Sequence, residues 1–208
     1  MKLYISKYSS IRNQQLVVDN NIVFQQDIFI NFADFIKAAY KECGISYPKF
    51  YKMDSLSKLA FVAAEVLLKD TTFLTRFSKE DIGVVIANAS STITTDIEFQ
   101  GSIDERSNYF PSPAIFVYTL PNIAIGEICI KNKIFGENCL LVQEKFDTAQ
   151  LVEYVNGLFT NGKVKACIAG WADINEKQEY QTTLMLVEKE GKTAFDQKNI
   201  LNIHNNGE

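Results

Sequence analysis

Three short apolar runs constrain the fold of this chain more than any other feature of its sequence. They are Ile82–Ala87, Val164–Gly170 and Thr182–Val187, and polar residues flank them. A run without polar alternation is typical of a strand that is buried on both faces, as in sheets covered by helices. We therefore expect a sheet that lies between layers of helices.

Helical patterns separate these runs. The stretch Phe32–Cys43 ends at Gly44, a common helix stop, and Asp54 is placed to cap a helix whose apolar residues recur every three or four positions. Asp147 is placed to cap a further helix, Thr148–Thr160. Two more helices are expected over Ser90–Gln100 and from Pro121 to about Lys131, the second apolar almost all round and therefore covered.

The remaining strands complete a layered α/β domain. Lys2–Ser6 and Gly136–Val142 read as strands, and Gln14–Val18 and Ile22–Gln25 flank a tight turn as a β-hairpin. Alternation of strands with helices predicts a central mixed five-stranded sheet in one domain, residues 1–190. Residues 191–208 are expected to be a polar tail.

Charge and histidine content exclude several functions. The net charge is −4 and the pI about 5.2, so no basic stripe is available for nucleic acid. The single histidine, His204, lies near the C-terminal end. A nucleophile with a histidine base and a multi-histidine metal site are therefore not expected, and we predict no metal and no cofactor.

The cysteines indicate a reducing compartment. Cys43, Cys129, Cys139 and Cys167 are far apart, and none forms a CxxC pair. The N-terminus does not read as a signal peptide, and no apolar run approaches the roughly 18 residues that span a bilayer. We expect a cytoplasmic protein without a membrane segment, in which the thiols are small core residues.

Several segments, in order, resemble the N-terminal half of a β-ketoacyl-[acyl-carrier-protein] synthase, a family with the thiolase-like fold. The resemblance covers roughly residues 1–189. It rests on Lys52-Met53-Asp54, Ile82–Ile86, Ser112–Phe116, Pro121-Asn122, Gly126, Gly136-Glu137-Asn138 and Gly162–Gly170. It implies a thiolase-like half fold and acyl chemistry on acyl carrier protein.

The resemblance also implies a nucleophile that this chain does not have. In the family, a cysteine at the N-terminus of a buried helix attacks the acyl thioester, because the helix end lowers the pKa of its thiol. Here that position falls on Lys145, beside Glu144. The excursion that follows Asp173 in the family is also missing. The chain is about half the family's length and lacks the half that supplies two catalytic histidines.

Alternatives remain open for four residues. Cys139 is either a relocated nucleophile or a strand residue packed in the sheet. Glu144 and Lys145 either bind a ligand or form a solvated turn. Asn122 either hydrogen-bonds near a pocket or caps a helix or bonds buried backbone.

We predict a non-catalytic ketosynthase-like subunit, comparable to the chain-length factors of polyketide, aryl-polyene or fatty-acid-type pathways. Its partner would be an active condensing enzyme or an acyl carrier protein. Because the family dimerises through the strand that matches Gly136–Val142, we expect a homodimer or heterodimer through this strand. The alternatives are an acyltransferase or synthase that uses Cys139 or a site completed by a partner chain, and a fold that serves only protein contact.

Overall fold

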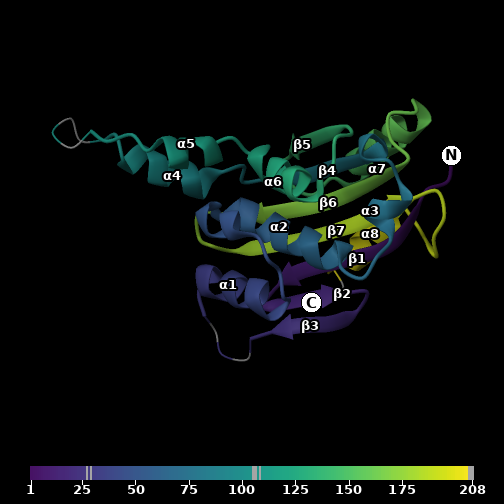
Figure 1. Cartoon of the computed structure of the whole chain (residues 1–208), viewed down its shortest axis with the longest axis horizontal. Helices are drawn as coiled ribbons and strands as arrows, with labels where there is room; N and C mark the ends of the chain where they lie inside the picture. Colours follow the sequence, from purple (N-terminus) through teal and green to yellow (C-terminus); the bar gives the residue numbers. More distant parts are fainter. Residues whose placement is uncertain (27, 29, 105–106, 108, 206–208) are drawn as a thin grey trace.

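A computed structural model describes residues 1–26, 28, 30–104, 107 and 109–205 of the protein. Among these residues one mixed sheet has eight strands, in the order β3-β2-β1-β7-β6-β4-β5, and β8 pairs with β1 (Figure 1). The strands are β1 (Tyr4–Arg12), β2 (Gln15–Val18), β3 (Asn21–Gln25), β4 (Ile82–Asn88), β5 (Asn138–Val142), β6 (Ala166–Ile174), β7 (Tyr180–Glu188) and β8 (Thr193–Ala194).

The prediction of a five-stranded sheet underestimated the number of strands. Five of the expected strands are adjacent in the sheet, in the order β1, β7, β6, β4 and β5, with β5 at one edge. The predicted hairpin β2–β3 adds to it, because β1 continues to Arg12 and pairs with β2. Strand β4 runs parallel to β5 and β6, whereas β7 is antiparallel to both β6 and β1, so the sheet is mixed as expected.

Helices cover both faces of the sheet. On one face lie α1 (Phe32–Glu42), α2 (Ser55–Leu68) and α6 (Ile123–Asn132), and on the other α7 (Thr148–Thr160) and α8 (Gln197–Asn205). Alternate strand residues supply the two cores: Ile168 faces α2, whereas Cys167 and Ala169 face α7. Because these strands contribute side chains to both cores, their sequences are continuous apolar runs.

Shorter elements connect these layers. They are η1 (Pro48–Lys52), α3 (Phe73–Arg76), η2 (Lys79–Asp81), α4 (Ile93–Gly101) and α5 (Pro113–Tyr118). Figure 1 shows α4 and α5 side by side, projecting beyond one end of the sheet. The rings of Phe99 and Phe116, 5.4 Å apart, join the two helices.

The C-terminal segment differs from the expected polar tail. Residues 193–205 form β8 and α8, and Phe195 and Ile200 are buried in the core beneath α7. The sequence suggests a tail because α8 has few apolar residues. Those few lie on one side of the helix, and this side packs on the core. Residues 206–208, also expected to be loose, lie outside the described part of the chain.

Helix α6 is not covered all round. Ala124, Ile125 and Ile128 are buried, but Ile130 is 63% exposed. The helix packs against α2 with one face only, so its apolar composition overstates its burial. Within the described ranges, no helix is both long and apolar enough to cross a membrane.

Candidate functional site

The helix mouth, residues 143–147, joins β5 to α7 at the carboxyl end of the parallel strands. The backbone N–H of Gln143 donates to the carbonyl of Asn88 at the end of β4, at 2.8 Å. Its side-chain oxygen accepts from the Asp147 N–H at 3.1 Å. Asp147 caps α7 as predicted, by accepting from the Gln150 N–H at 3.0 Å. The mouth is therefore held at both ends.

The helix mouth presents an amine and an acid. The side chains of Glu144 and Lys145 are both exposed. Neither makes a hydrogen bond or an ion pair with another residue of the described chain. Lys145 lies two residues before Asp147, the cap of α7. The assignment of the family's cysteine position to Lys145 stays a prediction.

A carboxylate on β6 fixes the turn that follows β4. Asp173 Oδ1 accepts from Asn88 Nδ2 at 2.9 Å, from the Ala89 N–H at 3.0 Å and from the Ser90 N–H at 2.7 Å. Asp173 Oδ2 accepts from the Ser90 hydroxyl at 3.0 Å. Bonds to an ionised acceptor are stronger than neutral ones. Asn88 also accepts the Gln143 N–H, so this network reaches the helix mouth.

His204 lies beside the helix mouth, where sequence analysis did not place it. Its ring is 4.8 Å from that of Phe146 and its Nδ1 is 3.1 Å from the Thr183 hydroxyl. Burial, with a smaller contribution from Arg12, lowers the pKa of His204 to about 4, so the ring is neutral at pH 7. The spacing of Ile200 and Ile203 is the sequence signal that could have placed this helix on the core.

Burial disfavours the thiolate form of three of the four thiols. Cys139 is half-buried in β5, and the proximity of its thiol, together with burial, raises the pKa of Tyr154 to about 12. Burial raises the thiol pKa of Cys43, brings that of Cys129 to about 11, and raises that of the fully buried Cys167. Thiols with raised pKa values stay protonated near neutral pH and are poor nucleophiles.

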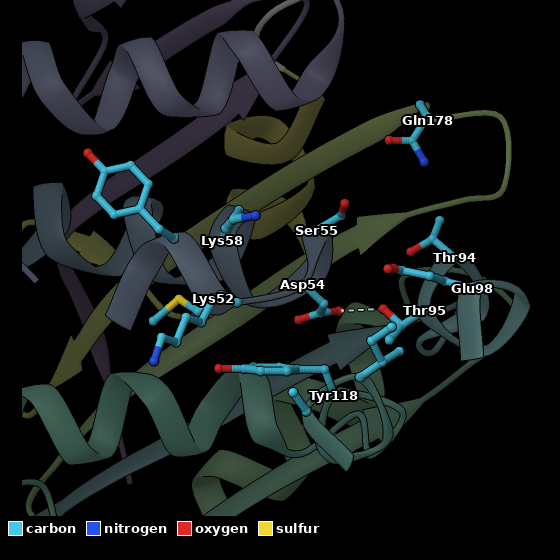
Figure 2. A pocket seen from close by; sticks show the side chains of 13 residues that line it. Lys52, Asp54, Ser55, Lys58, Thr94, Thr95, Glu98, Tyr118 and Gln178 are labelled. Carbon is cyan, nitrogen blue, oxygen red and sulfur yellow. Dashed lines mark hydrogen bonds between the residues drawn. The ribbon is translucent and has the colours of Figure 1, made fainter. Parts of the chain in front are cut away.

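A hollow of about 420 Å³ lies where α2, α4 and α5 meet (Figure 2). At its centre Asp54 caps α2, accepting from the Ser57 N–H at 3.0 Å and from the Thr95 hydroxyl at 3.1 Å. Burial raises the pKa of Asp54, and these hydrogen bonds oppose the rise. The polar side chains around it are those of Lys52, Ser55, Lys58, Thr94, Glu98, Tyr118 and Gln178.

A buried carboxylate near this hollow was not predicted. Glu127, on α6, is 2% exposed, and it accepts from the Tyr118 hydroxyl at 2.9 Å and pairs with Lys49 at 2.7 Å. It thereby links α6 to α5 and to η1. Burial and Glu127 raise the pKa of Tyr118. A single acid in an apolar helix gives no sequence signal of this role.

Asn122 is the remaining predicted site residue. It holds the N-cap position of α6, but its side chain is exposed and makes no capping bond to the helix. It lines neither the hollow at Asp54 nor the one that adjoins it. The structure thus places Asn122 away from both hollows. It places no thiol of the described residues at the helix mouth.

Comparison with known proteins gives structural neighbours only. No family model and no curated protein sequence matches the chain. The ishigamide ketosynthase/chain length factor is similar with a TM-score of 0.67 and 17% identity, covering 90% of this chain and 62% of that one. The chain has a ketosynthase-like fold.

Two further neighbours have the same fold. A type II PKS acyl-carrier protein in complex with its ketosynthase gives a TM-score of 0.64 and 10% identity, covering 97% of this chain and 64% of that one. A ketosynthase in complex with its chain length factor from Xenorhabdus doucetiae gives 0.60 and 12%, covering 92% and 80%. The chain thus spans less than two thirds of the first two ketosynthase-like chains. These likenesses identify the thiolase-like fold predicted from the sequence.

Proposed function

We propose that the chain is a non-catalytic, chain-length-factor-like subunit of a cytoplasmic acyl-chain pathway of the polyketide, aryl-polyene or fatty-acid type. The observation that carries this proposal is the exposed Lys145 at the helix mouth, with no thiol in its place. The family's reaction passes through an acyl thioester on a cysteine, and a lysine side chain has no sulfur with which to form that thioester.

The partner proposed is an active condensing enzyme, with acyl carrier protein as its substrate carrier. Two of the structural neighbours contain a chain length factor with a ketosynthase, and these names support the choice. Strand β5 ends the sheet, and among the described residues no strand pairs with its outer edge. An open strand edge is a template for pairing with another chain.

Apolar side chains surround this edge. Val142 on β5 is 59% exposed, Phe135 is 69% exposed and Ile130 on α6 is 63% exposed. Large exposed apolar areas are typical of protein interfaces. We place the interface along residues 136–142, through which a homodimer would also form.

Assembly in solution tests this proposal. The mass of the purified chain, measured alone and with a full-length ketosynthase, should include a dimer that Val142→Asp weakens at least tenfold. Val23→Asp is the matched control, because Val23 is 47% exposed on β3 at the opposite edge of the sheet. A monomer under all conditions, or equal effects of both variants, would contradict the proposed interface.

A further inference from the structure

A hollow of about 620 Å³ lies between two turns of the sheet and the start of α1. We call it the hollow at Gln14, and it is larger than the one of about 420 Å³ at Asp54. Its lining comes from the β1–β2 turn, from the residues before α1, and from residues 175–179 between β6 and β7 together with the start of β7. None of its described lining residues belongs to the helix mouth, so the two places are separate.

Gln14 holds three segments together beside this hollow. It is 8% exposed and lies in the β1–β2 turn, where its backbone is left-handed at φ 56°. Its backbone N–H donates to the Tyr180 hydroxyl at 3.2 Å, and its carbonyl accepts from the Gln26 N–H at 3.1 Å. Its side-chain Oε1 accepts from the Ile30 N–H at 3.0 Å. The side-chain amide is therefore fixed in one orientation.

The amide nitrogen of Gln14 is a donor without an acceptor. Within the described ranges its Nε2 makes no hydrogen bond, and no side-chain polar atom there is both fully buried and unpaired. Nε2 therefore remains accessible, although nine-tenths of the residue is buried. Because Gln14 lines the hollow, this access is through the hollow. A ligand that supplies an acceptor would compensate a donor held in this way.

Tyr180 supplies a second donor at the same hollow. Its oxygen accepts from the Gln14 N–H, and none of the described residues accepts its hydroxyl proton. Burial raises the pKa of Tyr180, against the hydrogen bond from Gln14, so the hydroxyl keeps its proton near pH 7. The ring packs against Phe32 and Phe35, with centroids 4.9 and 5.7 Å away, and this packing fixes the hydroxyl.

The rest of the lining suits a neutral ligand. Ile30, Phe32 and the ring of Tyr180 supply apolar wall. The charged residues of the described lining are one lysine, Lys177, and one acid, Glu179, and both are exposed. Because these two charges are opposite, the hollow has no net charge that would favour an ion. Apolar walls with a few fixed polar groups are typical of small-molecule sites.

We infer that the hollow at Gln14 binds a neutral, mostly apolar molecule with a carbonyl oxygen, which accepts from Gln14 Nε2 and from the Tyr180 hydroxyl. A carbonyl oxygen has two lone pairs and can accept both hydrogen bonds. This inference does not depend on the proposed function, because the hollow shares no described lining residue with β5 or with the helix mouth.

Titration of the full chain followed by NMR tests the site. The probes are 2-acetylnaphthalene and 2-ethylnaphthalene, which have the same rings, but only the first has a carbonyl. We expect the ketone to shift the amide signals of residues 30–32 and 177–180. The measured quantity is the affinity of the ketone divided by that of the hydrocarbon. Because both probes need the same hollow, a general loss of fold affects both and leaves this ratio unchanged. The anion 2-naphthoate should bind more weakly than the ketone.

Two variants each remove one donor. Tyr180→Phe should lower the affinity ratio about fivefold, and Gln14→Glu, which keeps the acceptor for the Ile30 N–H, about tenfold. Tyr51→Phe and Gln197→Glu are the matched controls and should leave the ratio unchanged. Tyr51 is 54% exposed on η1, and Gln197 is exposed on α8, on the other face of the sheet from α1. No shift of these signals with either probe, a ratio that neither donor variant changes, or tighter binding of 2-naphthoate than of the ketone would overturn the inference.

Discussion

The ring of His204, in the last helix, lies edge-on to the ring of Phe146, with 4.8 Å between centroids and an angle of 67°. The backbone carbonyl of the same histidine accepts from Gln181 Nε2 on β7 at 3.2 Å. Helix α8 is therefore fixed to the sheet and to the helix mouth at one place.

Docking of α8 predicts a large difference between two adjacent residues. Ile200 is fully buried and Leu201 is 41% exposed. Ile200→Ala should lower the free energy of unfolding by about 2–5 kcal/mol, whereas Leu201→Ala should change it by under about 1 kcal/mol. Urea denaturation measures both. Equal, small effects would show that α8 does not pack on the core.

The burial of His204 predicts a loss of stability in mild acid. Its pKa is lowered to about 4 in the fold, from an ordinary value of 6.5, so between these pH values the unfolded chain binds more protons. Its contribution is thus present above about pH 6.5 and is lost as the pH falls toward 4, by about 3 kcal/mol in all. The difference in unfolding free energy between wild type and His204→Asn isolates this effect, since other groups cancel. A difference that stays constant from pH 7 to 4.5 would refute the burial of the ring.

Two glycines predict opposite results. A Cβ on Gly170 in β6 would collide with the backbone carbonyl of Thr183 in β7, whereas one on Gly126 in α6 would meet nothing within 4 Å. Gly170→Ala should separate β6 from β7 and destabilise the chain by more than about 3 kcal/mol. Gly126→Ala should leave stability unchanged or raise it by up to about 1 kcal/mol. Thermal unfolding checks the pair, and similar melting temperatures would speak against this strand pairing.

The network at Asp173 predicts a graded series. Asp173→Ala leaves the Ala89 and Ser90 N–H groups without their acceptor, and we expect a loss of about 2–4 kcal/mol. Asp173→Asn keeps one acceptor oxygen and should cost less. Amide exchange of residues 89 and 90 is the readout that separates this role from general destabilisation. Unchanged exchange in Asp173→Ala would remove the network from the account.

Local sequence signals predicted the middle of this fold well. Continuous apolar runs in the sequence identified β4, β6 and β7 as strands buried on both faces. Asp54 and Asp147 were identified as helix caps. The hairpin followed from residues that accept a left-handed backbone, as Asp19 and Asn20 do at φ 47° and 67°. In each case the cause of the structure lies within a few residues of the element.

The elements that were missed depend on distant partners. Strand β1 was expected to end at Ser6, but it continues to Arg12 because β7 and β2 pair with it. Strand β8 has only two residues and exists through its pairing with Tyr4 and Ile5. The hollow at Asp54 was missed for the same reason, since Asp54 and Thr95, which are far apart in the sequence, meet only in the fold.

Acylation of the helix mouth tests the central claim most directly. Intact-mass analysis after incubation with an acyl-carrier thioester should show no adduct on the wild-type chain. Maleimide labelling afterwards should find all accessible thiols unmodified. The variant Lys145→Cys, which places a thiol two residues before the cap of α7, should acquire the acyl group. An adduct on wild-type Cys139 that disappears in Cys139→Ala would contradict the account of a non-catalytic subunit.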